Sequence, residues 1–307
     1  MPSYEFVTVD VFTARRFGGN PLAVFPAAAG LGDDAMQALA AEFNLSETTF
    51  VLPPDDPRHS ARVRIFTPRG ELPFAGHPNV GTGFVLARRM EHPPEHFTFE
   101  EPAGLVRTHI LREPAVGTAS GAICGARVAA PLSLTIGSAV PVATVAACAG
   151  LAPGDIATTA HAPLIASVGT PFVFAEVVSL AALARATPDL AAFRAAQPHF
   201  AAEAPRFGLH LYVRLDGSAL KLRTRMFAPL AGVLEDPATG SANAALAALL
   251  TAQAPGGDIA LTFEIEQGIE LGRPSRIVAS ARRTAEGPVS ATVAGACVPV
   301  MAGTVTL

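Results

Sequence analysis

The feature that most constrains this chain is a short phrase of small residues that occurs twice. Gly76-His77-Pro78-Asn79 leads into an apolar run, and Gly240-Ser241-Ala242-Asn243 leads into another. A strand-like segment precedes each phrase, residues 64–68 in the first copy and 225–229 in the second. The order strand, turn, helix start presents free N–H groups and the positive end of a helix dipole at the turn, which suits an anion. Two copies therefore predict two similar half-sites.

A second echo extends the repeat. Gly19-Asn20-Pro21 and Gly169-Thr170-Pro171 each lead into apolar residues. One such match is commonplace, because Gly-x-Pro is a frequent way to enter a strand. Two matches in the same order predict that a whole unit is duplicated. A chain of 307 residues has room for two lobes of ordinary domain size.

Composition limits the partners and the compartment. Half of the residues are hydrophobic and 16% are charged, which supports a large buried core. The net charge of −4 gives no electrostatic reason to expect nucleic acid or an anionic membrane as a partner. The longest stretch of small and apolar residues, 139–151, is too short to span a bilayer. With no secretory signal in the first residues, we expect a cytoplasmic protein.

The cysteines are few. Cys124, Cys148 and Cys297 are odd in number and widely spaced. This pattern argues against a disulfide framework or a zinc cluster and favours buried free thiols. Histidine pairs with metal-ligand spacing are also absent from the sequence, so we expect no metal.

Periodicity predicts an α+β fold with one central helix per lobe and mixed, largely antiparallel strands. In the first half, Asp33-Asp34 is expected to cap a helix over 35–43 that ends at Asn44, and a helix with Pro78 in its first turn is expected to end near Met90. In the second half we expect a helical stretch over 180–195 and a hairpin turning at Asp216-Gly217. The strand-like segments are 4–12, 22–25, 48–52, 61–66, 210–215, 220–226 and much of 276–307. The Gly-rich turns match neither a dinucleotide fingerprint nor a P-loop.

Two side chains near the first turn could carry chemistry. Glu47 lies between a predicted helix and a predicted strand. It is either a solvated loop residue or, given its apolar flanks, a partly buried carboxyl group suited to proton transfer. His77 is either a local cap, a satisfied core imidazole, or a partner in hydrogen bonding and proton transfer.

Two more lie at the second turn. Asp236 is either an Asx-turn residue or a substrate contact, and Ser241 is either a helix cap or a ligand for a carboxylate. Ser241 takes in the second copy the place that His77 takes in the first. A Ser–His–Asp hydrolase is a third reading, but Ser241 lacks a Gly-x-Ser-x-Gly elbow.

Four motifs in this order resemble the PhzF (phenazine-biosynthesis isomerase-like) family. They are Phe17-Gly18-Gly19-Asn20-Pro21, Asn44-Leu45-Ser46-Glu47-Thr48, Phe74-Ala75-Gly76-His77-Pro78 and Glu235-Asp236-Pro237-Ala238-Thr239-Gly240-Ser241-Ala242. The resemblance implies a diaminopimelate-epimerase-like fold, with two pseudo-symmetric lobes, each a curled, barrel-like sheet around a central helix. The expected first lobe is 1–118, completed by strands in 290–307, and the second is 119–289, with the active site in the cleft between them. The resemblance also implies a homodimer.

The resemblance assigns roles to residues of this chain. Glu47 would move a proton without any cofactor, and His77 and Asp236 would assist. The family's known reaction isomerises trans-2,3-dihydro-3-hydroxyanthranilate by shifting a proton within the ring, so we expect a small carboxylate-bearing substrate. The residues expected to bind it are Asn20, Gly76, Thr239, Gly240 and Ser241.

The chain also departs from related patterns. The epimerases and proline racemases of this fold use two cysteines, where this chain has Ala75 and Thr239. That argues against a two-thiol racemase. Asn79 stands where a small residue such as threonine is expected, which predicts a different pocket rim. The rival interpretation is a non-catalytic protein that binds small carboxylates on the same fold.

Overall fold

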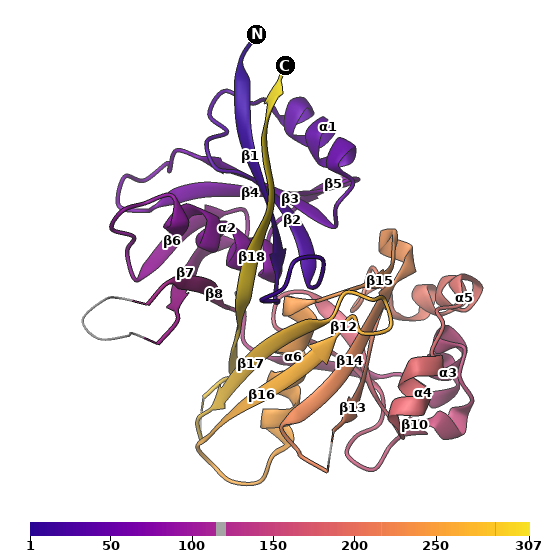
Figure 1. Cartoon of the computed structure of the whole chain (residues 1–307). Helices are drawn as coiled ribbons and strands as arrows, with labels where there is room; N and C mark the ends of the chain where they lie inside the picture. Colours follow the sequence, from indigo (N-terminus) through magenta and orange to yellow (C-terminus); the bar gives the residue numbers. More distant parts are fainter. Residues whose placement is uncertain (115–120, 216, 286) are drawn as a thin grey trace. The chain divides into compact units, whose positions relative to one another are not determined.

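The computed structural model describes residues 1–114, 121–215, 217–285 and 287–307. The chain forms two compact units, one of Met1–Pro131 with Val293–Leu307 and one of Leu132–Thr292 (Figure 1). The lobe boundary predicted at residues 118 and 119, and position 216 of the predicted hairpin turn, lie outside the described residues.

The strands of the first unit pair in a closed cycle, in the order β8-β18-β1-β2-β3-β4-β6-β7 and back to β8. Strand β5 adds to the end of β4. The elements are β1 (Ser3–Val11), β2 (Asn20–Phe25), α1 (Asp33–Phe43), β3 (Glu47–Leu52), β4 (Ala61–Thr67), β5 (Gly70–Leu72), α2 (Gly76–Arg88), β6 (His96–Glu101), β7 (Gly104–Arg112), β8 (Ile123–Ala129) and β18 (Ser290–Thr306).

The two ends of the chain lie side by side in this unit, where β1 and β18 run antiparallel (Figure 1). The amide of Leu307 donates to the carbonyl of Pro2 at 3.1 Å. Within the described residues, no helix is long and apolar enough to cross a membrane.

Helix α2 is the core of the barrel. All of its residues except Leu86 and Arg88 are buried. Glycines let the strands approach it: a Cβ on Gly81 would lie 2.5 Å from Leu22 Cδ2, and one on Gly83 would lie 2.6 Å from Thr108 Cγ2. The small residues of this segment therefore allow a helix to fit inside a closed sheet.

Helix α1 covers the outer face of strands β2, β3 and β4. Phe25 and Phe50 stack there with ring centroids 4.9 Å apart, and Phe66 meets Phe50 edge-on at 5.6 Å. The predicted end of α1 at Asn44 is confirmed, with Asn44 in the left-handed region at φ 50°. The predicted cap is wrong, because Gly32 is the N-cap and both aspartates lie in the first turn, where they complement the helix dipole.

The second unit follows the same plan around helix α6, of which all residues except Ser241 and the last two are buried. Its elements are β9 (Thr135–Ala139), α3 (Val142–Ala149), β10 (Ile156–Ala157), β11 (Leu164–Ser167), β12 (Pro171–Val177), α4 (Leu180–Arg185), α5 (Leu190–Phe200), β13 (Gly208–Arg214), β14 (Lys221–Ala228), β15 (Val233–Asp236), α6 (Gly240–Gln253), β16 (Ile259–Gln267) and β17 (Ser275–Arg283).

The helix predicted over 180–195 is two helices. Helix α4 ends at Arg185, and Asp189 begins α5 by accepting hydrogen bonds from the amides of Ala191 and Ala192. Pro188 lies between them, lacks an N–H and disfavours helical backbone at the residue before it.

Strand pairing confirms the two pseudo-symmetric lobes. Strands β2 and β3 are parallel, as are β12 and β13. The next pairs, β3–β4 and β13–β14, are antiparallel. Parallel pairing returns at β4–β6 and β14–β16, whose connections contain α2 and α6, and β6–β7 and β16–β17 are antiparallel.

We predict that Gly81→Ala lowers the free energy of unfolding by about 1–3 kcal/mol, because the added methyl group would overlap Leu22 and Val11. Gly70→Ala is the matched control, since a Cβ there meets nothing within 4 Å. Urea denaturation of both variants measures the effect. Equal stabilities would contradict the proposed close packing of α2.

Candidate active site

The first turn leads into helix α2 and is closed by a hydrogen bond from a side chain of that helix. Ala75 is the N-cap and has no polar side chain to cap the helix, so the first-turn amides are donors without intrahelical acceptors. Asn79 Nδ2 donates to the carbonyl of Ala75 at 3.0 Å. Asn79 is fully buried, and its amide closes the turn from within; an effect of Asn79 on the pocket rim stays a prediction.

Strand β3 brings Glu47 to this turn. Thr49 on the same face of β3 shares a 2.9 Å hydrogen bond with Thr82 of α2. Glu47 lies two residues earlier and therefore faces the same helix, nearer its start. Glu47 Oε2 lies 3.3 Å from His77 Nε2, and the two side chains are 16% and 6% exposed. The partial burial predicted for Glu47 is what the structure shows.

Burial sets the charge state of His77. It lowers the pKa of the imidazole to about 3, so the ring is neutral near pH 7. The contact with Glu47 is consequently not a salt bridge at that pH. A proton on either of the facing atoms would have an acceptor on the other side.

Asn20 lies at the start of β2 and is fully buried. It shares a strand face with Leu22, the residue that pairs with Glu47 across β2 and β3. Asp10, which the sequence reasoning missed, anchors the preceding loop: its Oδ2 accepts a 2.6 Å hydrogen bond from the amide of Phe17. In the antiparallel pair of β1 with β2, Asp10 is opposite Pro21, the residue that follows Asn20.

The second turn is built differently. Thr239 is the N-cap of α6, Gly240 begins the helix and Ser241 follows it. The expectation that Ser241 caps the helix is therefore wrong. Thr239 Oγ1 donates to Asp236 Oδ2 at 2.6 Å, which ties the cap residue to the buried end of β15.

Gln267 braces this turn from the end of β16, and no sequence signal marked it. Its Nε2 donates to the carbonyl of Asp236 at 2.9 Å and to Thr239 Oγ1 at 3.1 Å. Its Oε1 accepts from the Thr239 amide at 3.1 Å and from Asn243 Nδ2 at 2.7 Å. Asn243 Nδ2 also donates to the Thr239 carbonyl at 3.0 Å, which repeats the bond from Asn79 to Ala75.

The buried histidines of the second unit have partners other than Ser241. His210 Nε2 lies 3.2 Å from Asn243 Oδ1, and burial lowers its pKa to about 3. His161 Nε2 lies 2.8 Å from the Tyr212 hydroxyl. The described contacts thus give no support to a Ser–His–Asp arrangement at Ser241.

Each turn is preceded by a similar arginine–glutamate pair in its own unit. Arg64 holds Glu71 through two 2.7 Å bonds, and Arg225 holds Glu235 through bonds of 2.8 and 2.7 Å. Each arginine also lies over a phenylalanine of its own strand, at 5.0 Å in the first unit and 4.9 Å in the second. These bidentate pairs fix the strand hairpin that leads into each turn.

The position of Glu47, by contrast, is not repeated as a carboxyl group in the second unit. Leu22 pairs with Glu47, whereas its counterpart Phe172 pairs with Gly208. A Cβ on Gly208 would already lie 3.1 Å from the ring of Phe172. The second unit thus has no carboxyl group where Glu47 lies, and its own acid, Asp236, stands where the first unit has Leu72.

The three thiols belong to other elements than the two turns: Cys124 to β8, Cys148 to α3 and Cys297 to β18. Cys148 and Cys297 are buried and Cys124 is partly buried. Burial raises the pKa of Cys148 to about 12 and raises that of Cys297 as well. Their thiols therefore stay protonated near neutral pH and are poor bases. This agrees with the sequence argument against a two-thiol racemase.

The chain belongs to the phenazine biosynthesis-like (PhzC-PhzF) protein family, whose model matches residues 9–303. It is 42% identical over 282 residues to an uncharacterized isomerase of Mesorhizobium japonicum, with 90% of each chain covered. It is 34% identical over 294 residues to the trans-2,3-dihydro-3-hydroxyanthranilate isomerase of Pseudomonas aeruginosa, with 95% of each covered. The chain is an isomerase of this family.

Solved structures share the fold. A PhzF-family phenazine biosynthesis protein of Bacillus anthracis has a TM-score of 0.85 at 24% identity, with both chains fully covered. A hydroxyproline epimerase of Agrobacterium vitis has a TM-score of 0.64 at 14% identity, covering 99% of this chain and 92% of the other. The predicted diaminopimelate-epimerase-like α+β fold is confirmed.

We predict that acid destabilises the fold through its buried histidines. His77 and His210 remain neutral in the folded chain down to a pH of about 3 but bind protons near pH 6.5 once unfolded. The stability present above pH 6.5 is therefore lost as the pH falls towards 3, at a slope approaching about 1.4 kcal/mol per pH unit for each histidine. Urea denaturation between about pH 7 and pH 4 measures it.

His77→Gln should remove one of these two contributions and flatten the slope. His92→Gln is the control, because the His92 side chain is 91% exposed. Identical slopes for His77→Gln and the wild type would contradict the buried, neutral state of His77.

Proposed function

We propose that this isomerase shifts a proton between carbon atoms of a small carboxylate-bearing substrate, such as trans-2,3-dihydro-3-hydroxyanthranilate, without a cofactor. In the proposed step Glu47 takes a proton from one ring carbon and returns it to another, and the double bonds move accordingly. Atoms and electrons are conserved, so the step needs no oxidant or reductant.

One observation carries the proposal: Glu47 Oε2 lies 3.3 Å from the neutral imidazole of His77 at the start of α2. Carbon acids are weak, so their deprotonation needs a base that is held in place and shielded from bulk water. Strand β3 and helix α2 fix the two groups, and both are largely buried. A neutral imidazole has one N–H donor and one nitrogen acceptor, so it can assist Glu47 through a hydrogen bond in both halves of the transfer.

The substrate's carboxylate has a complementary partner in the same unit. The first-turn amides of α2, beginning at Gly76, point out of the helix N-terminus, where the helix dipole favours negative charge. The same field would stabilise negative charge that develops as the carbon loses its proton. Asn20, at the start of β2 next to β3, is proposed to contact the substrate.

Two further parts of the proposal rest on the resemblance to the family: the role of the second unit in substrate binding, and the formation of a homodimer. Asp236, Thr239, Gly240 and Ser241 are the candidates for holding the substrate's remaining polar groups. The P. aeruginosa relative at 34% identity carries the name of the proposed reaction, which supports this choice of first substrate. Homodimerisation stays a prediction, which light scattering of the purified protein would test.

We predict that Glu47→Gln lowers turnover of trans-2,3-dihydro-3-hydroxyanthranilate by at least ~100-fold, because the amide cannot exchange a proton at this position. NMR of the reaction in D2O measures both substrate loss and deuterium entry into the ring. Glu42→Gln is the control, since Glu42 is exposed on α1. Substantial turnover by Glu47→Gln would sink the role assigned to Glu47.

A non-catalytic binding protein predicts a different result. The wild type would then gain thermal stability with the substrate, while NMR would detect neither product nor deuterium incorporation. That outcome with this substrate and with other small cyclic carboxylates would overturn the proposed activity.

A further inference from the structure

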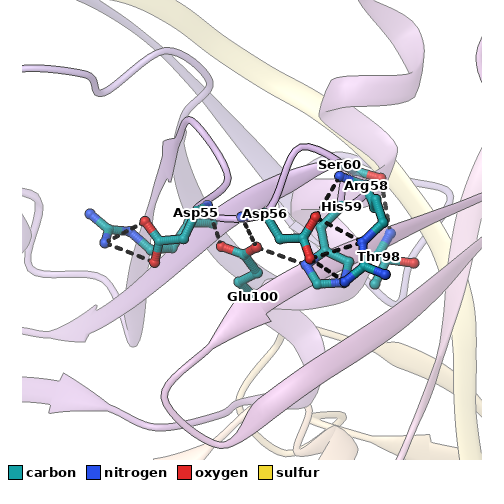
Figure 2. Close-up of polar contacts among 8 residues, drawn as sticks. Asp55, Asp56, Arg58, His59, Ser60, Thr98 and Glu100 are labelled. Carbon is teal, nitrogen blue, oxygen red and sulfur yellow. Dashed lines mark hydrogen bonds and ion pairs between the residues drawn. The ribbon is translucent and has the colours of Figure 1, made fainter.

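A second buried carboxyl group lies in the first unit. Strand β6 alternates, so that Phe97, Phe99 and Glu101 face the barrel interior. Glu100 points the other way and binds the loop of residues 55–59, accepting from the amides of Asp55 and Asp56 (Figure 2). Glu101 is 8% exposed, and both of its carboxyl oxygens are buried without a well-formed hydrogen bond among the described residues. A carboxylate so placed would lose most of its hydration with little compensation.

Strand register identifies the counterpart of Glu101 in the second unit. In the parallel pair β4–β6, Arg62 is opposite Glu100. In the parallel pair β14–β16, Arg223 is opposite Glu266. The following residue is the last of its strand in each case, Glu101 in β6 and Gln267 in β16. Glu101 therefore occupies the position of the residue that braces the second turn.

The proline of each turn also accepts a hydrogen bond from a residue near this strand end, although the two donors differ. Just beyond β6, the amide of Ala103 donates to the carbonyl of Pro73 at 3.1 Å. At the start of β17, Ser275 Oγ donates to the carbonyl of Pro237 at 3.0 Å. Pro73 and Pro237 stand at the same place before their helices. The C-terminal ends of β6 and β16 thus lie next to the turns that precede α2 and α6.

Gln267 braces its turn because one neutral group both donates and accepts. Its N–H groups reach Asp236 and Thr239, and its oxygen receives Asn243. In the first unit Asn79 is the counterpart of Asn243, and it lies within reach of Glu101. A carboxylic acid, like the amide of Gln267, both donates and accepts, whereas a carboxylate has no donor.

We propose that Glu101 works as a neutral carboxylic acid, a positioning residue that holds the turn carrying Gly76, His77 and Asn79 as Gln267 holds the second turn. Its protonation state then controls the binding of anionic substrate. When Glu101 ionises, its donor is lost and a negative charge appears near the helix N-terminus, where it opposes a carboxylate ligand. This consequence for activity rests on the proposed function.

The electrostatic surroundings favour the neutral form. Burial raises the pKa of Glu101 to about 8, against a smaller opposing effect of the Asn79 side chain. His77 on α2 has a pKa of about 3 and does not titrate in this range. A cavity of about 370 Å³ leads to this end of β6, and the charged groups that line it beside Glu101 are Asp55, Arg62, Arg64, Glu71 and Glu100. The ion pair with Glu71 raises the pKa of Arg64, and hydrogen bonds lower that of Glu100.

We predict that KM of the wild type for trans-2,3-dihydro-3-hydroxyanthranilate rises with pH above about 8, approaching tenfold per pH unit. Glu101→Gln keeps the shape, the donor and the acceptor but cannot ionise, so its KM should stay flat to about pH 9.5. Glu101→Leu should raise KM at every pH. Glu91→Gln, whose side chain is 91% exposed, is the control and should follow the wild type. A wild-type rise that persists in Glu101→Gln would overturn the inference.

Infrared difference spectra of Glu101→Gln against the wild type provide a readout that needs no turnover. The wild type should show a protonated-carboxyl band at about pH 7 that Glu101→Gln lacks and that disappears above the pKa of about 8. Absence of that band would overturn the inference even if the enzyme is active. A band that behaves as predicted, together with no turnover of any carboxylate tried, would leave Glu101 neutral and refute the proposed function instead.

Discussion

The structure depends on enclosing a helix within strands. Helices α2 and α6 are buried along almost their whole length, so their side chains must be small where a strand comes near, as at Gly81 and Gly83. The same enclosure removes water from the helix start, where the backbone has unmatched donors. The carbonyl before each helix is satisfied by an asparagine of its own first turn, Asn79 or Asn243. The first-turn amides then remain for a ligand.

The two units repeat their supporting contacts but not the carboxyl group of Glu47. The bidentate pairs of Arg64 with Glu71 and of Arg225 with Glu235 repeat closely. Glu47 has no counterpart, because Gly208 takes its place. The repeated frame is therefore fixed by packing, and the proposed reaction would depend on a few positions that differ between the units. One carboxyl group next to one imidazole is the arrangement that the proposed proton shift, which begins and ends on the same group, would need.

Sequence reasoning reached the parts of this structure that have local signals. The phrases at Gly76 and Gly240 predicted where both central helices begin, and the Gly-x-Pro echo predicted β2 and β12. It assigned the N-cap of α6 to Ser241, a common capping residue, whereas the N-cap is Thr239, which is bound by Asp236 and Gln267. Pro188 marks the break between α4 and α5, but the sequence prediction placed a single helical stretch over 180–195 there.

The supporting residues had no such signal. Gln267 and Glu101 are ordinary polar residues at strand ends, and their roles follow from the registers of β16 with β14 and of β6 with β4. Register is set by long-range pairing, which a single sequence does not display. The closeness of Glu47 to His77 likewise needed β3 packed against α2.

The proposed proton transfer depends on a neutral, buried imidazole that faces the Glu47 carboxyl group. Nitrogen NMR of the protein with labelled histidine, assigned by comparison with His77→Gln, tests it most directly. The His77 ring signals should stay those of a neutral imidazole from about pH 8 down to about pH 5, because burial lowers its pKa to about 3. Titration of His77 near its ordinary pKa of about 6.5 would contradict the claim.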